Sequence, residues 1–265
     1  MSEVYIDAVG LFAPGLNGWR DSVDVLRGQR PYVPEPLPKY RPQLLSSNER
    51  RRATNCVRIA FGACEDAIGE RLEMARELAG IFVSSGGDFH VQDQICRGLL
   101  RDEVMLSPTQ FHNSVHNAPA GYWSIASGST APSVSLSAFD YSVSAGLLEA
   151  VPFVQQEQQP SLLVYSDADI AEPLRQKRPV LEAFATALWL TPQRTSNSLA
   201  ALTITLEDSV ATDTASNDPA LDLLRKGNPA ARILPLLEAL ARGNAITLGF
   251  PTAADQQVLV SLRPM

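Results

Sequence analysis

Residues 113–135 read NSVHNAPAGYWSIASGSTAPSVS, and the order of the elements in and around this stretch decides the fold. A helix is expected over residues 107 to about 127, because the Ser-Pro pair at its start suits the first turn of a helix. Pro119 lies inside that helix and lacks a backbone N–H, which predicts a kink or a break. The segment Ser133 to Leu136 is expected to be a short strand.

Strands and helices alternate on both sides of this stretch. Apolar runs predict strands over residues 4–9, 79–84, 162–166, 202–206 and 257–262. Helices are expected over residues 48–72, 91–100, 142–155, 179–189 and 221–242, with interruptions at Pro152 and near residues 227–229. This alternation favours an α/β layered fold, with helices around a mixed, largely parallel sheet. No composition shift divides the chain, so residues 1–265 are expected to form a single domain.

The composition excludes several classes of protein. The chain has 265 residues, of which 45% are hydrophobic and 19% charged, so it is not disordered. Its net charge of −7 argues against non-specific binding of nucleic acid. No apolar stretch approaches the roughly 20 residues of a membrane span, and the N-terminus lacks the basic start of a signal peptide. A cytoplasmic protein is expected.

Chemical motifs are weak along the whole chain. His112 and His116 stand four residues apart, but Asn113 occupies the place of the glutamate that zinc proteases need, so capping or packing is favoured over a metal site. No nucleotide-binding glycine loop or serine-hydrolase elbow is present, and no cofactor is predicted. Asp167 and Asp169 end a strand and are interpreted as solvated loop residues. The three cysteines are expected to be reduced, buried and structural, at positions 56, 64 and 96.

A family resemblance rests on the quoted stretch. It is similar to the part of β-ketoacyl synthases that leads through an Asn, an Ala-Gly pair and a glycine turn to a Pro-Ser before the nucleophile strand. The matching residues are Asn117, Ala120, Gly121, Ile125, Gly128, Pro132, Ser133, Val134 and Ser135. The resemblance covers roughly residues 4–169, with a weaker closing strand. It implies a thiolase-like layered fold, truncated relative to a full ketosynthase.

The departures from the family pattern are as informative as the matches. Synthases place a nucleophilic cysteine at the start of the helix after that strand. An ungapped alignment puts this position on Asp140, and a slip of one or two residues puts it on Phe139 or Ala138. No cysteine follows Arg97, and the two catalytic histidines of the family's second half have no counterpart, since the last histidine is His116. The isolated chain is therefore expected to lack condensing activity.

The resemblance implies a chain-length-factor-like subunit that forms a heterodimer with a catalytic ketosynthase and meets an acyl carrier protein transiently. Its role would be to shape the acyl tunnel in polyketide biosynthesis, including the aryl polyene type, or in a fatty-acid-like pathway. The strand at residues 133–136 would pair across the dimer. Candidate tunnel or interface residues are Phe111, His112, Ser114, Val115, His116, Asn117 and Phe139.

Two other functions stay open at this point. The chain could be a small enzyme that acts on acyl thioesters through residues such as Asp140 or His116. It could also be a stand-alone module that binds a carrier protein or a lipid. The overall acidic charge counts against attraction to an acidic carrier protein, although Arg50 to Arg52 could form a local basic patch.

Overall fold

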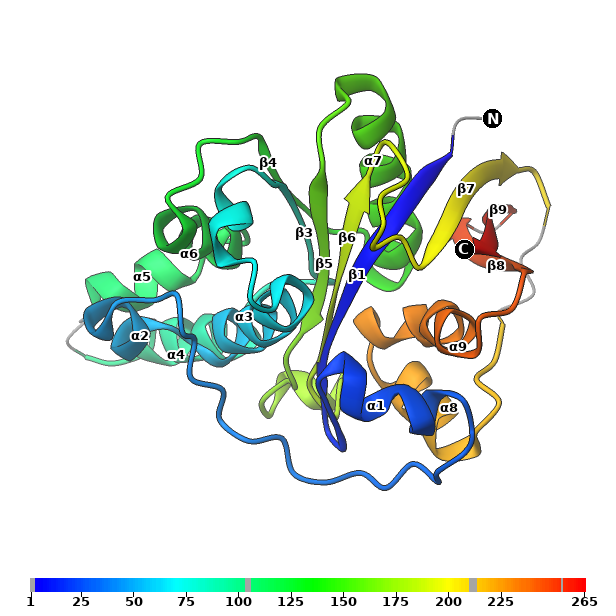
Figure 1. The fold of residues 1–265 in the computed structure, drawn as a ribbon. Coiled ribbons are helices and arrows are strands. Elements are labelled where there is room, and N and C mark those ends of the chain that lie inside the picture. The colour runs from blue at the N-terminus through cyan, green and yellow to red at the C-terminus, as the bar shows by residue number, and fades with distance from the viewer. Residues whose placement is uncertain (1–2, 103–105, 210–213, 254) are drawn as a thin grey trace.

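A computed structural model describes residues 3–102, 106–209, 214–253 and 255–265 of the protein. Within these ranges, nine strands form one sheet in the order β4-β3-β5-β6-β1-β7-β9-β8, and β2 pairs with β1 (Figure 1). The strands are β1 (Val4–Ala13), β2 (Leu16–Asn17), β3 (Ala79–Val83), β4 (Ser133–Leu136), β5 (Ser161–Asp167), β6 (Phe184–Thr191), β7 (Ala200–Glu207), β8 (Ile246–Ala253) and β9 (Gln256–Pro264).

Helices cover both faces of this sheet. The α-helices are α1 (Trp19–Leu26), α2 (Ser47–Arg52), α3 (Asn55–Ile68), α4 (Phe89–Leu99), α5 (Pro108–Asn113), α6 (Ala118–Ser127), α7 (Ser142–Glu157), α8 (Pro219–Gly227) and α9 (Leu234–Arg242). The described residues also form the short 3-10 helices η1 (Leu72–Arg76), η2 (Phe139–Tyr141), η3 (Leu174–Gln176) and η4 (Ala230–Ile233). Among the described residues, none of these helices combines the length and the apolar character that crossing a bilayer requires.

The expected α/β layered fold with a mixed sheet is confirmed, but its parallel part is smaller than expected. Parallel pairing joins β3 to β4 and β3 to β5, whereas the other pairs among the described strands are antiparallel. The main reason is β6, which occupies residues that the sequence suggested would be helical. Every residue of β6 is buried, between β5 and β1. An apolar run buried on both faces has no strand periodicity, so it resembles a buried helix in sequence.

Three expected helices also differ in detail. The helix predicted over residues 48–72 is two helices, α2 and α3, which separate where Ala53 adopts an extended conformation. The helix predicted over residues 107–127 is broken just before Pro119, as that proline suggested. Pro152, in contrast, does not interrupt α7, so that prediction is wrong. It lies inside the helix, next to the buried Val151. Cys56 and Cys64 are buried as expected, but Cys96 is exposed, so that part of the prediction is wrong.

The sheet separates two apolar cores. One core lies between the sheet and α1, α7, α8 and α9, and includes Leu11, Leu147 and Tyr165. The other lies under α3 and α6, where the rings of Phe61 and Trp123 meet edge to face at 5.3 Å. Both faces of the central strands are therefore closed by helices, which explains why β3, β5 and β6 are buried along their whole length.

Helix α7 is enclosed on two sides by the same sheet. It packs against β3 and β5 and also against β7, β8 and β9, so the sheet curls around it. The hydroxyl of Ser144 donates to the carbonyl of Pro251 on β8 at 2.6 Å, and the hydroxyl of Tyr165 on β5 donates to the carbonyl of Val143 at 2.8 Å. Gly146 allows this approach, because a Cβ there would lie 2.6 Å from the Tyr165 oxygen.

We predict that Gly146→Ala lowers the free energy of unfolding by about 1–3 kcal/mol, because the added methyl group overlaps the buried Tyr165 side chain. Gly121→Ala on α6 is the matched control, since no atom lies within 4 Å of a Cβ added there. The control is expected to be neutral or to stabilise by up to about 1 kcal/mol. Urea denaturation measures both effects, and equal effects at the two glycines would contradict the close approach of α7 to Tyr165.

Candidate functional site

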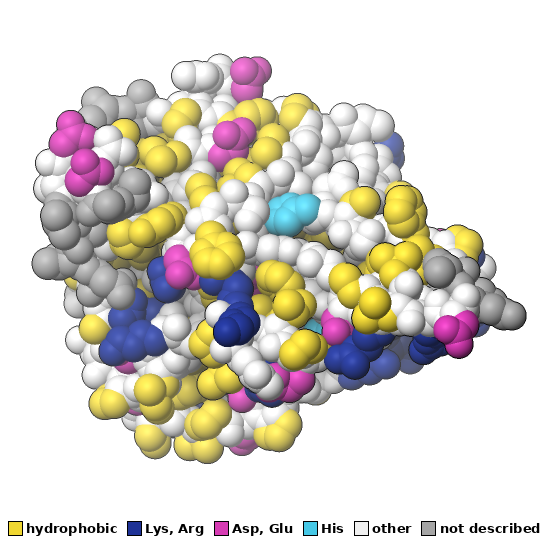
Figure 2. All heavy atoms as spheres, turned by 180° about the vertical axis from the view of Figure 1, so that it is seen from behind, with side chains coloured by type: hydrophobic (Ala, Val, Ile, Leu, Met, Phe, Trp, Pro, Cys, Tyr) yellow, Lys and Arg dark blue, Asp and Glu magenta, His cyan; other side chains and the backbone are white. Residues whose placement is uncertain are grey.

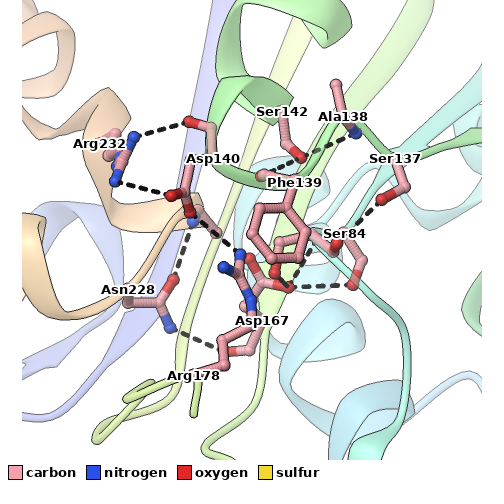
Figure 3. Close-up of polar contacts among 12 residues, drawn as sticks. Ser84, Ser137, Ala138, Phe139, Asp140, Ser142, Asp167, Arg178, Asn228 and Arg232 are labelled. Atoms are coloured by element: carbon pink, nitrogen blue, oxygen red, sulfur yellow. Dashed lines mark hydrogen bonds and ion pairs between the residues drawn. The ribbon is translucent and has the colours of Figure 1, made fainter.

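The carboxyl ends of the parallel strands β3, β4 and β5 lie at one edge of the sheet, and a buried carboxylate joins the loops that leave them. Asp167, at the end of β5, accepts hydrogen bonds on Oδ1 from the Ser84 hydroxyl at 3.0 Å, the Ser85 amide at 2.8 Å and the Ser85 hydroxyl at 3.0 Å. The Ser137 hydroxyl, just beyond β4, donates to the Ser85 carbonyl at 2.9 Å (Figure 3). The exits of the three strands are thus tied together.

Asp167 is a structural residue and not the solvated loop residue that the sequence suggested. Burial raises the pKa of its carboxyl, and the hydrogen bonds from Ser85 and Ser84 and the charge of Arg178 offset this only in part. Asn228 lies 61 residues after Asp167 in the sequence. Its side-chain amide donates to the carbonyls of Asp167 at 3.0 Å and Glu182 at 2.8 Å. Within the described part of the chain, no group of three or more His, Cys, Asp or Glu side chains is arranged to hold a metal ion.

The turn between β4 and α7 has an unusual backbone. Phe139 has φ of 56°, a left-handed conformation that is uncommon for a residue other than glycine. Ser142 holds this turn, because its hydroxyl donates to the Phe139 carbonyl at 2.7 Å and accepts from the Ala138 amide at 3.1 Å. Ser142 is buried at the first turn of α7, so the turn is fixed to the helix. We call residues 137–142 the elbow.

Two arginines bind Asp140, which follows Phe139 in the elbow. Arg178 donates to Asp140 Oδ1 at 3.1 Å, and its guanidinium carbon also lies 3.5 Å from the centre of the Phe139 ring. Arg232 donates to the Asp140 carbonyl at 2.8 Å and lies 3.6 Å from Oδ2 (Figure 3). A carboxylate paired with two guanidinium groups is a poor nucleophile and a poor base, since both roles require its lone pairs to be free.

The predicted histidines lie apart from the elbow carboxylate. His116 Nε2 lies 3.2 Å from the carbonyl oxygen of Ser84, so it contacts the loop after β3. His112 is exposed on α5, and its ring meets Tyr122 edge to face at 5.7 Å. Asn117 is exposed at the start of α6. The structure therefore does not assemble the predicted residues into one catalytic group.

A thiol and a histidine do line one small cavity, but its chemistry is unsuited to catalysis. Cys56 and His116 are among its lining residues, and its volume of about 10 Å³ holds about one water molecule. Burial raises the pKa of the Cys56 thiol well above its usual value, and the nearby carboxylates of Asp88 and Asp167 raise it further. Thioester chemistry at a cysteine needs a thiolate, so Cys56 is interpreted as a packing residue.

Exposed apolar side chains lie on α5, on α6 and at the elbow. Phe111 on α5 is 66% exposed, Val115 46%, Ile125 on α6 65% and Phe139 57%. Helix α6 packs on β3 and β4, and the elbow follows β4 directly, so Ile125 and Phe139 lie on segments next to β4, whereas α5 packs against α4. Figure 2 shows the molecule from behind, where hydrophobic side chains gather across the middle of the face among Lys and Arg. A surface of this kind is typical of a site that binds another protein.

Arg178, Arg232 and Asn228 belong to this site, although no sequence pattern selects them. They lie 38, 92 and 61 residues from the partners that they bind, and no motif surrounds them. One signal was present for Phe139, since a one-residue slip in the family alignment placed it at the nucleophile position. Its left-handed backbone agrees with that slip, because nucleophiles at strand-to-helix turns occupy strained conformations.

Comparison with known proteins identifies the family. The model of the β-ketoacyl synthase N-terminal domain matches residues 27–245. No curated protein matches the sequence. A structure of the ketosynthase ApeO in complex with its chain length factor ApeC from Xenorhabdus doucetiae matches with a TM-score of 0.72 and 24% identity, over 98% of this chain and 100% of the other.

Two further solved structures have similar folds. The ishigamide ketosynthase/chain length factor matches with a TM-score of 0.73 and 12% identity, over 100% of both chains. The complex AntDE:AntF, a type II polyketide synthase acyl-carrier protein with its hexaketide-bound ketosynthase, matches with a TM-score of 0.74 and 13% identity, over 100% of this chain and 99% of the other. At these identities the likeness establishes the thiolase-like fold of the chain.

We predict that Asp167→Asn changes how stability depends on pH. Because the pKa of Asp167 is raised in the folded state, the wild-type gains stability from its protonation as the pH falls, and this gain is complete below the unfolded value of about 3.9. The variant carries no buried charge, so its advantage over wild-type should be largest near pH 8 and shrink toward pH 4. Urea denaturation of both proteins at several pH values measures this difference, and parallel stability curves would contradict the prediction.

Proposed function

The chain belongs to the family of the β-ketoacyl synthase N-terminal domain, and we propose that it acts as a non-catalytic, chain-length-factor-like partner of a catalytic ketosynthase. The observation that carries this proposal is the elbow. Phe139 stands there at a left-handed backbone position, and the following Asp140 is paired with two arginines. Neither side chain can attack a thioester, which supports a role beside an active subunit and not in the reaction itself.

The edge of the sheet at β4 supports a protein partner. Strand β4 ends the strand order, so the backbone groups on its outer side have no neighbouring strand within the described chain. An exposed edge is a template for pairing with another chain, and natural proteins usually cover it. We propose that the partner ketosynthase covers β4 and that the exposed side chains of α5 and α6 extend the same interface.

The proposed role of this interface is to limit the acyl chain. Phe111 is exposed on α5, and Val115 is exposed just after that helix. The hydroxyl of Ser114, which lies between them in the sequence, donates a hydrogen bond to the Phe111 carbonyl at 2.8 Å. A bulky side chain at the end of a tunnel stops elongation by steric exclusion, whereas a small one leaves room for further carbons. We assign Phe111 the blocking role, with His112, His116 and Asn117 beside it, in biosynthesis of polyketides such as the aryl polyene type or of fatty-acid-like chains.

A basic segment supports transient contact with an acyl carrier protein. Residues 36–64 contain six Lys and Arg residues and one acidic residue, although the whole chain has a net charge of −7. Arg58 joins this segment by donating to the carbonyls of Tyr40 and Arg50. Burial and the like charge of Arg50 lower the pKa of Arg58, which agrees with a concentration of positive charge. Such a surface attracts an acidic partner despite the overall charge.

We predict that the chain co-purifies with its ketosynthase as a 1:1 complex and that Ile125→Glu weakens this complex at least tenfold. A buried glutamate without a partner is costly at an apolar interface. Leu223→Glu on α8 is the matched control, since Leu223 is 72% exposed and α8 lies far from α6 in Figure 1. Size-exclusion chromatography and titration calorimetry measure the complex. A stable monomer that leaves the ketosynthase unchanged would overturn the proposed function.

We predict that Phe111→Ala lengthens the product of the reconstituted pair, because removing the ring opens the end of the tunnel. Asp140→Ala, measured in the purified complex, should leave the condensation rate within a few-fold. Mass spectrometry of the products and a single-turnover assay test the two variants. A loss of about 10⁴-fold for Asp140→Ala would identify Asp140 as a catalytic group instead.

A further inference from the structure

We propose that Phe139 is an aromatic anchor that inserts into the partner ketosynthase, and that Arg178, Asp140 and Arg232 are positioning residues that present its ring. This inference rests on the proposed function, because the occupant to which it commits is the ketosynthase subunit at the β4 edge. It adds a role for the elbow, which would bind the partner subunit and would not take part in the reaction.

The first step is that the isolated chain gains little from a phenylalanine at this position. The left-handed region is unfavourable for a residue other than glycine, and Gly or Asn would adopt it more easily. Phe139 is 57% exposed, so burial in this chain returns only part of that cost. A strained and exposed aromatic residue therefore points to a contact outside the chain.

The second step is that the surrounding residues fix the elbow in this conformation. Ser142 holds both the Phe139 carbonyl and the Ala138 amide, and the Asp140 carbonyl is held by Arg232. Arg178 contacts both neighbouring residues of the elbow, because it pairs with the Asp140 carboxylate and stacks on the Phe139 ring (Figure 3). Strain of this kind persists only where several contacts over-determine the backbone, so the ring is presented in one orientation before a partner arrives.

The third step identifies the occupant. Phe139 lies three residues after Leu136, the last residue of β4, and three extended residues span at most about 10 Å. Phe139 therefore lies close to the end of the edge strand that the proposed partner covers. Aromatic rings and arginines are also the residues most often found at the energetic centre of protein interfaces. The stack of Phe139 on Arg178 offers both in one place.

The test is Phe139→Gly, measured with the full chain and its ketosynthase. Glycine relieves the backbone strain but removes the ring and its stack, so the thermal midpoint of the isolated chain should stay within about 3 °C of wild-type. The dissociation constant of the heterodimer should rise at least tenfold. Arg178→Lys keeps the charge but loses the planar stack, and it should weaken the heterodimer by a smaller factor. Leu223→Ala on α8 is the control and should change neither quantity.

The outcomes separate this inference from the proposed function. If wild-type chain and ketosynthase do not associate, the proposed function fails and the anchor fails with it. If Ile125→Glu disrupts the heterodimer but Phe139→Gly binds like wild-type, the interface stands and the anchor is wrong. If Phe139→Gly unfolds the chain, the ring has a structural role and the inference is also overturned.

Discussion

The enclosure of α7 is the constraint on which the rest of the structure depends. A single sheet can bury both sides of one helix only if it curls, and here β3 and β5 pack on one side of α7 while β7, β8 and β9 pack on another. Gly146 against Tyr165 sets how closely the helix approaches β5. Once α7 is placed, its first residue Ser142 fixes the turn that joins it to β4. The geometry of the elbow therefore follows from the packing of the core.

The polar network at the carboxyl ends of the strands serves the same purpose. Asp167 binds the loop after β3, and Ser137 ties the exit of β4 to that loop. Arg178 and Arg232 then hold Asp140 from segments that follow β5 and α8. A buried charge is expensive unless it is well hydrogen-bonded, so a network of this kind contributes more to a unique arrangement of the loops than to stability. In this chain the network holds the elbow in place at the surface of the protein.

The sequence was sufficient to predict the elements whose signals are local. The strand over residues 133–136, the helix that begins at Ser142 and the break before Pro119 were all predicted, because turn chemistry and periodicity act within a few residues. The strand β6 was missed because burial on both of its faces erases the alternation that identifies a strand. The arginines of the elbow could not be predicted either, because pairing over 38 and 92 residues depends on the topology of the sheet and leaves no pattern in the sequence.

The separation of geometry from chemistry explains how a fold of this kind can carry a different role. The conformation at residue 139 is set by α7, Ser142 and the arginine pair, and none of these contacts needs a nucleophile at that residue. A thiol at this position would be a potential nucleophile, whereas the phenylalanine of this chain presents an exposed apolar side chain. The chemistry of the turn therefore depends on the side chain at the elbow, while the backbone around it is held by Ser142 and Arg232.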